Sequence, residues 1–554
     1  MEMRAIVRKA RAGSAPGPNG IPYKVYKMCD RLLKILWQIV KVHWQQRRLA
    51  PCNMSSEGIF IPKEENSSTK EQFRTVSLLN VEIKIPLAVL SRRITNFWIS
   101  NKYIDTSIQK GGIPGVSGCI EHTSVLTQQI KEAKENKSDL AVLWLDLANA
   151  FGSIPHKLIE LTLRTYHVPE SFIELIMNYY DNFKIRFSLN NFTTAWQKLE
   201  IGIITGCTLS MILFAGAMNL ILKSVQHNSR GQTMKSGIVQ PPSRAFVDDM
   251  TLITKSAIEA RWTLEELIEM IDWARMRFKP SKSRSMTLKK GKVDERMKYR
   301  IGEEIIPTIT EKPIKGLGKW YRASLTDKES ICNIHTQIAD WMKGINSSGL
   351  PGRFKLWIYQ HGVLQRLSWP FTVYNIPMTE IEKMEVTLNK HIKQWLGVPK
   401  SFSSVGLYST SSKLQLPLKS VTDEYKTTKA RQTMTIRNNA DPFVREAGIN
   451  LTSGRKWNVD TAVNEAQARL RQKDIIGSLC YFLSTSDLPV PNNKPKRDFG
   501  TKLGQILTFD LSLRGLICKI KKKYATGLFL GSSSFTVPIF AHIGLAGSQH
   551  HAKT

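Results

Sequence analysis

Three acidic residues in unusual surroundings are the strongest candidates for chemistry in this chain. Asp248 and Asp249 are adjacent and lie between apolar residues, in the stretch AFVDDMTLI. Successive strand side chains point to opposite faces, so both carboxylates can reach one ion only at a tight bend, such as a hairpin tip. A third acid, Asp146, follows the apolar run 140–145 and so ends an expected buried strand. Three strand-end carboxylates predict a site for two Mg²⁺ ions roughly 3.5–4 Å apart, one activating a hydroxyl and one holding a leaving phosphate.

The hydrophobic pattern around these acids predicts the elements that must hold them. Residues 140–145 indicate a strand, residues 158–165 a helix, and a hairpin is expected around Asn190 and Asn191. The apolar run 207–222 is too short for a membrane span and predicts a buried helix, and residues 258–278 have helical spacing. This succession of strand, helix, hairpin, helix and strand predicts a central domain over residues 111–300.

Other segments predict what flanks this domain. Residues 25–42 indicate an amphipathic helix, and the glycine-rich residues 111–118 indicate a structural turn, because they lack the Gly-Lys-Ser/Thr ending of a phosphate-binding loop. Beyond Gly318 the pattern becomes helical, and a capping box at residues 379–382 (TEIE) predicts a helix that stops near Gly397. Residues 487–496, with three prolines and two asparagines, predict a linker.

Several motifs around the acids resemble those of reverse transcriptases from non-LTR retrotransposons, of the type-1, R2-like kind. The segments LDLANAFGSIPH (145–156) and AFVDD (245–249) are similar to the two acidic palm motifs, with Phe246 where retroviral enzymes usually carry Tyr. APGPNGIP (15–22), IPK (61–63) and FRTVSLLN (73–80) resemble finger motifs, and GLG (316–318) resembles the primer-grip turn. The resemblance extends from residue 15 to about 448.

The resemblance implies an α+β right-hand polymerase that copies RNA into DNA. Its fingers would be residues 1–110, its palm with an antiparallel sheet 111–300, its helical thumb 301–448, and 449–554 would be an extension whose role the sequence does not reveal. The implied partners are an RNA template, a DNA primer and deoxynucleoside triphosphates. The implied cofactor is a pair of Mg²⁺ ions, which Mn²⁺ could replace.

The motifs also suggest a role for individual residues. Asp146 and Asp248 are expected to be shared by both metals, with Asp249 as a weaker ligand. Lys63 and Arg74 would hold the triphosphate, since a guanidinium can grip phosphate oxygens in pairs. Phe151 would exclude a 2′-hydroxyl from the sugar site, and Gly206 would let the template approach the backbone closely. Lys282, or the equally near Lys279, would donate a proton to the departing pyrophosphate. Gly316 and Gly318 would form the primer grip.

Two departures from the family pattern leave other interpretations open. Thr205 and Met211 stand where the family usually has Gln and Pro in Gln-Gly-x-x-Leu-Ser-Pro, and the family Gln helps to position the nascent base pair. One alternative is therefore an inactive relic that still binds nucleic acid. Another is an RNA-dependent RNA polymerase, which would share the metal-binding acids, although Phe151 disfavours it.

Charge and cysteine content bear on partners and location. The 79 Lys and Arg against 46 Asp and Glu give a net charge of +33, spread through the whole chain, which predicts a polyanionic partner contacted at many phosphates. The seven cysteines lack zinc-knuckle spacing, and no endonuclease motif is found, so the activity that nicks DNA is expected to come from elsewhere. Basic N-terminal residues without an apolar run predict an intracellular protein with no membrane association. The resemblance implies that it acts in the nucleus.

Overall fold

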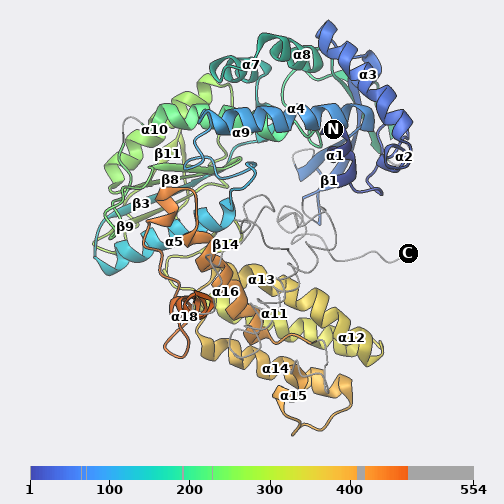
Figure 1. The fold of residues 1–554 in the computed structure, drawn as a ribbon. Helices are drawn as coiled ribbons and strands as arrows, with labels where there is room; N and C mark the ends of the chain where they lie inside the picture. Colours follow the sequence, from blue (N-terminus) through green and yellow to red (C-terminus); the bar gives the residue numbers. More distant parts are fainter. Residues whose placement is uncertain are drawn as a thin grey trace.

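The computed structural model describes residues 2–63, 65–69, 72–189, 192–226, 229–408 and 418–471. Two sheets and many helices form an open arc, with a central sheet in the middle, a smaller sheet with α1–α4 toward one end and a helical group, α11–α16, toward the other (Figure 1). The chain thus has the mixed helix and sheet composition that the sequence predicts. The expected linker at 487–496 lies outside the described residues.

The central sheet is antiparallel and has the order β10-β9-β3-β8-β7. Strand β3 lies in its middle and is buried at every residue. Side chains of β3 alternate between two cores: Leu140, Val142 and Trp144 pack on one face, and Ala141, Leu143 and Leu145 on the other. This double burial explains why the run is uniformly apolar. The strands are β3 (Leu140–Leu145), β7 (Ser243–Phe246), β8 (Asp249–Thr254), β9 (Arg284–Lys289) and β10 (Lys292–Val293).

Helices cover both faces of this sheet. Helix α5 (Gly118–Glu135) packs on one face through Leu126 and Ile130. Helices α9 (Ser210–Val225) and α10 (Ala257–Trp273) pack on the other face. Three shorter helices continue this second core: α6 (Ala150–Ser153), α7 (His156–Thr165) and α8 (Glu170–Asp181).

The second sheet corrects one prediction. Strand β1 (Ser55–Pro62) pairs antiparallel with β2 (Phe73–Leu79) and parallel with β4 (Lys184–Leu189). The hairpin expected around Asn190 and Asn191 is flanked by β4 and β5 (Phe192–Thr193), which do pair, while the two asparagines themselves lie outside the described residues. Because β4 pairs with β1, and β6 (Gln197–Lys198) pairs with β4, this hairpin belongs to the second sheet and not to the central one.

Four helices accompany the second sheet, and one of them was predicted with the wrong bounds. They are α1 (Glu2–Lys9), α2 (Tyr23–Met28), α3 (Asp30–Gln46) and α4 (Val81–Ser100), and α3 is followed by a 3₁₀ turn at Pro51–Asn53. The single helix expected over 25–42 is divided, because Cys29 has an extended backbone with φ −123° and ψ 93°. Apolar periodicity continues through the break and does not reveal it.

The helical group has a core of its own, built from residues such as Met342, Leu364 and Leu388. It contains α11 (Lys328–Ser347), α12 (Gly352–Ile358), a π-helical turn (Tyr359–Val363), α13 (Leu364–Val373), α14 (Met378–Leu396), α15 (Ser404–Tyr408) and α16 (Val421–Arg437). Two small hairpins, β11–β12 (Arg300–Ile301 and Glu304–Ile305) and β13–β14 (Ile314–Gly316 and Lys319–Tyr321), precede it. Helices α17 (Pro442–Arg445) and α18 (Val459–Arg471) follow α16 and share a core with α5.

Two helix ends differ from the sequence prediction, and a third agrees. Helix α14 begins at Met378 with Pro377 at its N-cap, so the capping box expected at Thr379 does not form. It ends at Gly397, which has φ 68°, as predicted. Helix α10 ends at Trp273 and not near 278. Within the described ranges, none of the helices is long and apolar enough to cross a bilayer.

Candidate active site

Strand pairing brings the three predicted acids to one edge of the central sheet. Strands β7 and β8 form a hairpin in which Phe246 pairs with Asp249, leaving Val247 and Asp248 as its two-residue tip. Leu145, the last residue of β3, pairs with Met250, so Asp146 follows β3 at the point where Asp249 begins β8. The backbone N–H of Asp146 also donates to Ser283 Oγ at 3.1 Å, which ties the end of β3 to the segment before β9.

The three carboxylates influence one another. Asp249 is exposed at the hairpin, but protein surrounds most of its carboxyl, and this desolvation together with the charges of Asp248 and Asp146 raises its pKa to about 7. Burial likewise raises the pKa of Asp248, and the charge of Asp146 adds to that rise. Asp248 and Asp249 therefore resist full ionisation beside Asp146.

Basic side chains from both sheets lie around the acids. Burial raises the pKa of Asp146, while the charges of Lys282, Lys279 and Lys63 act in the opposite direction. Arg74 lowers the pKa of Asp248 in the same way. Lys63 follows β1, and Arg74 lies on β2 opposite Ile61, so the second sheet brings its two predicted triphosphate ligands toward the acids of the central sheet.

This donor set suits divalent cations such as Mg²⁺. The residues offer carboxylate oxygens, the hard ligands that Mg²⁺ prefers, and their mutual repulsion would be relieved by a cation. In the described part of the chain, however, no three His, Cys, Asp or Glu side chains converge into a ready-made ligand cluster. The strand ends bring the acids near one another, and their assignment as metal ligands stays a prediction.

Phe151 lies five residues beyond Asp146, on the short helix α6. It is half-buried, and its carbonyl accepts a hydrogen bond from the N–H of Ile203 at 2.7 Å. Its ring stacks on Phe214 of α9, with centroids 4.8 Å apart and 10° between the ring planes. The ring is thus held in a fixed orientation close to the predicted catalytic strand end.

Gly206 and Thr205 join the turn before α9 to strand β2. Gly206 has φ 97°, and a Cβ atom there would come within 2.6 Å of the Ser77 carbonyl oxygen, so the turn itself requires glycine. Thr205 Oγ1 donates to the Thr75 carbonyl at 2.6 Å, and the Ser77 N–H donates to the Thr205 carbonyl at 2.9 Å. The threonine that departs from the family pattern therefore has a structural role that sequence reasoning missed.

Gly316 and Gly318 lie on either side of Leu317 at the tip of the β13–β14 hairpin. Leu317 and Gly318 have φ of 45° and 82°, the left-handed pair typical of a two-residue hairpin turn. A Cβ on Gly318 would lie 2.2 Å from Trp369 Nε1, and one on Gly316 would lie 3.4 Å from Trp144. The hairpin is therefore packed between the central sheet and α13, and its assignment to the primer stays a prediction.

The segment just before α5 was also missed. Gln109 and Lys110 are almost fully buried, at 0% and 1% exposure, and Gln109 forms an isolated bridge to Ala245 in β7. The only sequence signal nearby is the glycine-rich stretch at 111–118, which the structure shows to be a turn packed against the β7–β8 hairpin through Gly111. No residue pattern in that stretch indicates that it packs against the β7–β8 hairpin.

Comparisons with known proteins find relatives of this chain. Residues 61–321 match the family described as "Reverse transcriptase (RNA-dependent DNA polymerase)". The retrovirus-related Pol polyprotein from the type-1 retrotransposable element R2 of Nasonia vitripennis is 23% identical over 393 residues, covering 70% of this chain and 37% of that protein. The polyprotein from the type-2 element R2DM of Drosophila melanogaster is 22% identical over 396 residues, covering 70% of this chain and 36% of that protein.

Two further comparisons complete this picture. The R2 polyprotein of Bradysia coprophila is 22% identical over 413 residues, covering 73% of this chain and 46% of that protein. An apo telomerase structure from Candida tropicalis is similar over 48% of this chain and 56% of that chain, with 10% identity and a TM-score of 0.32, a value too low to support an argument. This chain spans a little over a third of the length of the first two R2 polyproteins. Residues 61–321 therefore match a reverse transcriptase core, and the chain is similar to the Pol polyproteins of R2-like, non-LTR retrotransposons.

Proposed function

We propose that this chain is an RNA-directed DNA polymerase that adds deoxynucleotides to the 3′-hydroxyl of a DNA primer on an RNA template. The observation that carries the proposal is the meeting of Asp146 with the Asp248-Asp249 hairpin, beside the cations of Lys63, Arg74 and Lys282. Concentrated negative charge next to concentrated positive charge suits a site that handles metal ions and a triphosphate together.

Each residue then has a task in nucleotide addition. Asp146 and Asp248, with a weaker contribution from Asp249, would hold two Mg²⁺ ions (or Mn²⁺ in their place), which supply Lewis-acid activation of the hydroxyl and of the phosphate. Lys63 and Arg74 orient the triphosphate, and Phe151 supports the deoxyribose. Lys282 or Lys279 donates a proton to the departing pyrophosphate. Catalysis by this chain's own residues thus consists of positioning and charge neutralisation, without a covalent intermediate.

The proposal assigns the larger parts of the chain as well. Residues 1–110 act as fingers, 111–300 as palm, 301–448 as thumb and 449–554 as an extension, in a right-hand arrangement. Gly206 brings the template close to the backbone, and the turn at Gly316 and Gly318 holds the primer. The site of action is the nucleus.

Primer extension with the purified full chain on an RNA template tests this function. Asp248→Asn removes one proposed metal ligand, so we expect the extension rate to fall by about two orders of magnitude or more while affinity for the primer–template is kept. Asp272→Asn, an exposed aspartate at the end of α10, is the matched control and should extend primers at the parental rate.

The outcomes separate the proposal from its alternatives. A parental rate for Asp248→Asn would show that the site assignment is wrong. A parent that binds the primer–template tightly but does not extend it would favour the inactive relic. A parent that prefers ribonucleotides would favour an RNA polymerase.

A further inference from the structure

The tip of the catalytic hairpin contains a strained residue. Val247 has φ 62°, a left-handed conformation that is rare for any residue with a side chain and a true outlier for a β-branched one. Such a conformation persists only when its surroundings impose it. Asp248 is the next residue, so whatever holds Val247 also sets the direction of Asp248.

The side chain of Gln109 makes the contacts that hold Val247. Its Oε1 accepts hydrogen bonds from the N–H of Val247 at 2.9 Å and from the N–H of Gly111 at 3.0 Å. Its Nε2 donates to the Val247 carbonyl at 3.4 Å. One amide group therefore binds both backbone polar groups of the strained residue, from a position 138 residues away in sequence.

Gly111 supports the same residue by close packing. A Cβ on Gly111 would lie 2.6 Å from both the backbone nitrogen and Cγ2 of Val247 and 2.9 Å from the Phe246 carbonyl carbon. Even one methyl group there would push the hairpin tip away. Gln109 and Gly111 both contact Val247, and we call these two residues together the cradle.

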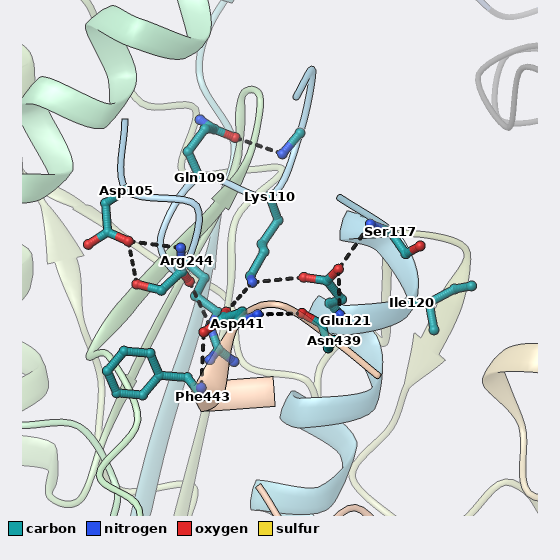
Figure 2. A network of polar contacts seen from close by, with 12 residues as sticks. Asp105, Gln109, Lys110, Ser117, Ile120, Glu121, Arg244, Asn439, Asp441 and Phe443 are labelled. Atoms are coloured by element: carbon teal, nitrogen blue, oxygen red, sulfur yellow. Dashed lines mark hydrogen bonds and ion pairs between the residues drawn. The ribbon is translucent and has the colours of Figure 1, made fainter. Parts of the chain in front are cut away.

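The cradle is fixed to the rest of the protein through Lys110. The backbone of the segment pairs with β7, with the N–H of Lys110 donating to Ala245 O at 2.7 Å and the N–H of Ala245 donating to Ile108 O at 2.9 Å. The side chain of Lys110 points away from that of Gln109 and ends between two carboxylates, Glu121 at 2.8 Å and Asp441 at 2.5 Å (Figure 2). All three of these charged side chains are buried, so the anchor is rigid.

We infer that Gln109 is a positioning residue of the polymerase, which holds Val247 in its left-handed conformation and thereby aims Asp248 at the reacting groups. This inference rests on the proposed function for its effect on catalysis, whereas the clamp itself is a property of the folded chain. Displacements of about 1 Å at a reacting centre can reduce rates by about 100-fold. Loss of the Gln109 amide should therefore reduce kcat without weakening contacts made elsewhere with primer and template.

Gln109→Met tests the clamp, because methionine has a similar length and shape but cannot bond the backbone of Val247. The matched control is Gln128→Met in α5, which removes a similarly buried amide that bonds Glu132 and the N–H of Asn450, away from the hairpin. We expect Gln109→Met to lower kcat about 10- to 100-fold, with the KM for the nucleotide and the primer–template affinity near parental values, and Gln128→Met to keep the parental kcat.

Hydrogen–deuterium exchange of the full chain without metal or nucleic acid supplies a readout that does not depend on activity. Amides of residues 245–250 should exchange faster in Gln109→Met than in the parent or in Gln128→Met. If this peptide is protected equally in all three proteins, or if Gln109→Met keeps the parental kcat, the inference is wrong. If the parent is inactive and only Gln109→Met shows faster exchange, the proposed function is wrong. The inference that Gln109 holds Val247 then still stands.

A second variant covers the case in which Gln109→Met does not fold. Gly111→Ala disturbs the cradle by overlap and removes no hydrogen bond, and its control is Gly344→Ala, where an added Cβ meets nothing within 4 Å. Gly111→Ala should reproduce the loss of kcat and the faster exchange at the hairpin. Parental values for both in a folded Gly111→Ala protein would overturn the inference.

Discussion

Phe151 lies parallel to Phe214, with ring centroids 4.8 Å apart and ring planes 10° apart. Phe214 is fully buried in α9, so it forms a firm support behind the half-buried ring of Phe151. A supported aromatic ring can exclude a 2′-hydroxyl by overlap, because it cannot move aside. The stack therefore gives a physical reason for the sugar selection predicted for Phe151.

Phe151→Val should admit ribonucleotides and cost some efficiency with deoxynucleotides through lost packing. The measurement is the ratio of kcat/KM for a deoxynucleotide to that for the matching ribonucleotide, which we expect to fall by at least about tenfold. Phe172→Val, a change of another half-buried phenylalanine in α8, is the control and should leave the ratio unchanged. An unchanged ratio in Phe151→Val would show that Phe151 does not select the sugar.

Salt should strongly weaken binding to a primer–template duplex. The net charge of +33 predicts many phosphate contacts and therefore the release of many counter-ions on binding. Affinity should fall on the order of 10³-fold between low and moderate salt, as a straight line of log affinity against log salt. A titration by fluorescence anisotropy measures the slope, and a flat line would be inconsistent with extensive phosphate contacts.

Thr205→Val should weaken nucleotide binding through strand β2. The change keeps the side-chain shape but removes the bond from Thr205 Oγ1 to Thr75 O, next to Arg74. We expect a loss of about 1 kcal/mol in stability and a higher KM for the nucleotide, with little change in kcat. Thr95→Val, which removes a comparable bond to Ser91 O inside α4, should leave that KM unchanged. Equal KM values for the two variants would count against the role of this contact.

Lys429→Met should make the stability of the helical group less dependent on pH, although it also leaves Thr372 O and Gln432 Oε1 without the bonds that Lys429 donates. Complete burial, reinforced by the nearby charge of Lys319, lowers the pKa of Lys429 from 10.5 to about 7. Between these two pH values the unfolded chain binds more protons than the folded one, so the free energy of unfolding of the parent rises with pH across this window. The stability of the variant relative to the parent should thus be highest at pH 7 and below, and should decrease by on the order of 1 kcal/mol or more toward pH 10.5.

Thermal unfolding followed at several pH values measures this difference. Lys343→Met, at an exposed position of α11, is the control and should show no such pH dependence. A stability difference for Lys429→Met that stays constant from pH 7 to pH 10 would contradict the prediction, since only the changing protonation of Lys429 makes it vary.

The sequence indicated those parts of the fold that depend on local pattern. Strand β3 was predictable because every residue of 140–145 is apolar, and the bend at Val247 and Asp248 because two adjacent acids between apolar strands need one. The resemblance to non-LTR reverse transcriptases is confirmed by the family match over residues 61–321 together with the similarity to R2 Pol polyproteins.

Features that depend on distant partners or on single backbone angles could not be predicted. The break at Cys29 interrupts a helix whose apolar spacing continues, and Pro377 takes the N-cap position that the capping-box pattern gave to Thr379. The assignment of β4 to the second sheet depends on its pairing with β1, more than 100 residues earlier in the chain. Gln109 is an ordinary polar residue in the sequence, and only the fold shows that it lies on Val247.

The contact between Lys110 and Asp441 also has a consequence for how the protein is made. The two residues are 331 positions apart, so Lys110 leaves the ribosome long before one of its two carboxylate partners has been synthesised. During that interval the buried lysine has Glu121 alone to balance it, which is costly in a dry interior. The buried ion-pair network around Lys110 is therefore complete only when the chain has been made past Asp441, and a truncation after α16 would remove one of the two counter-charges of Lys110.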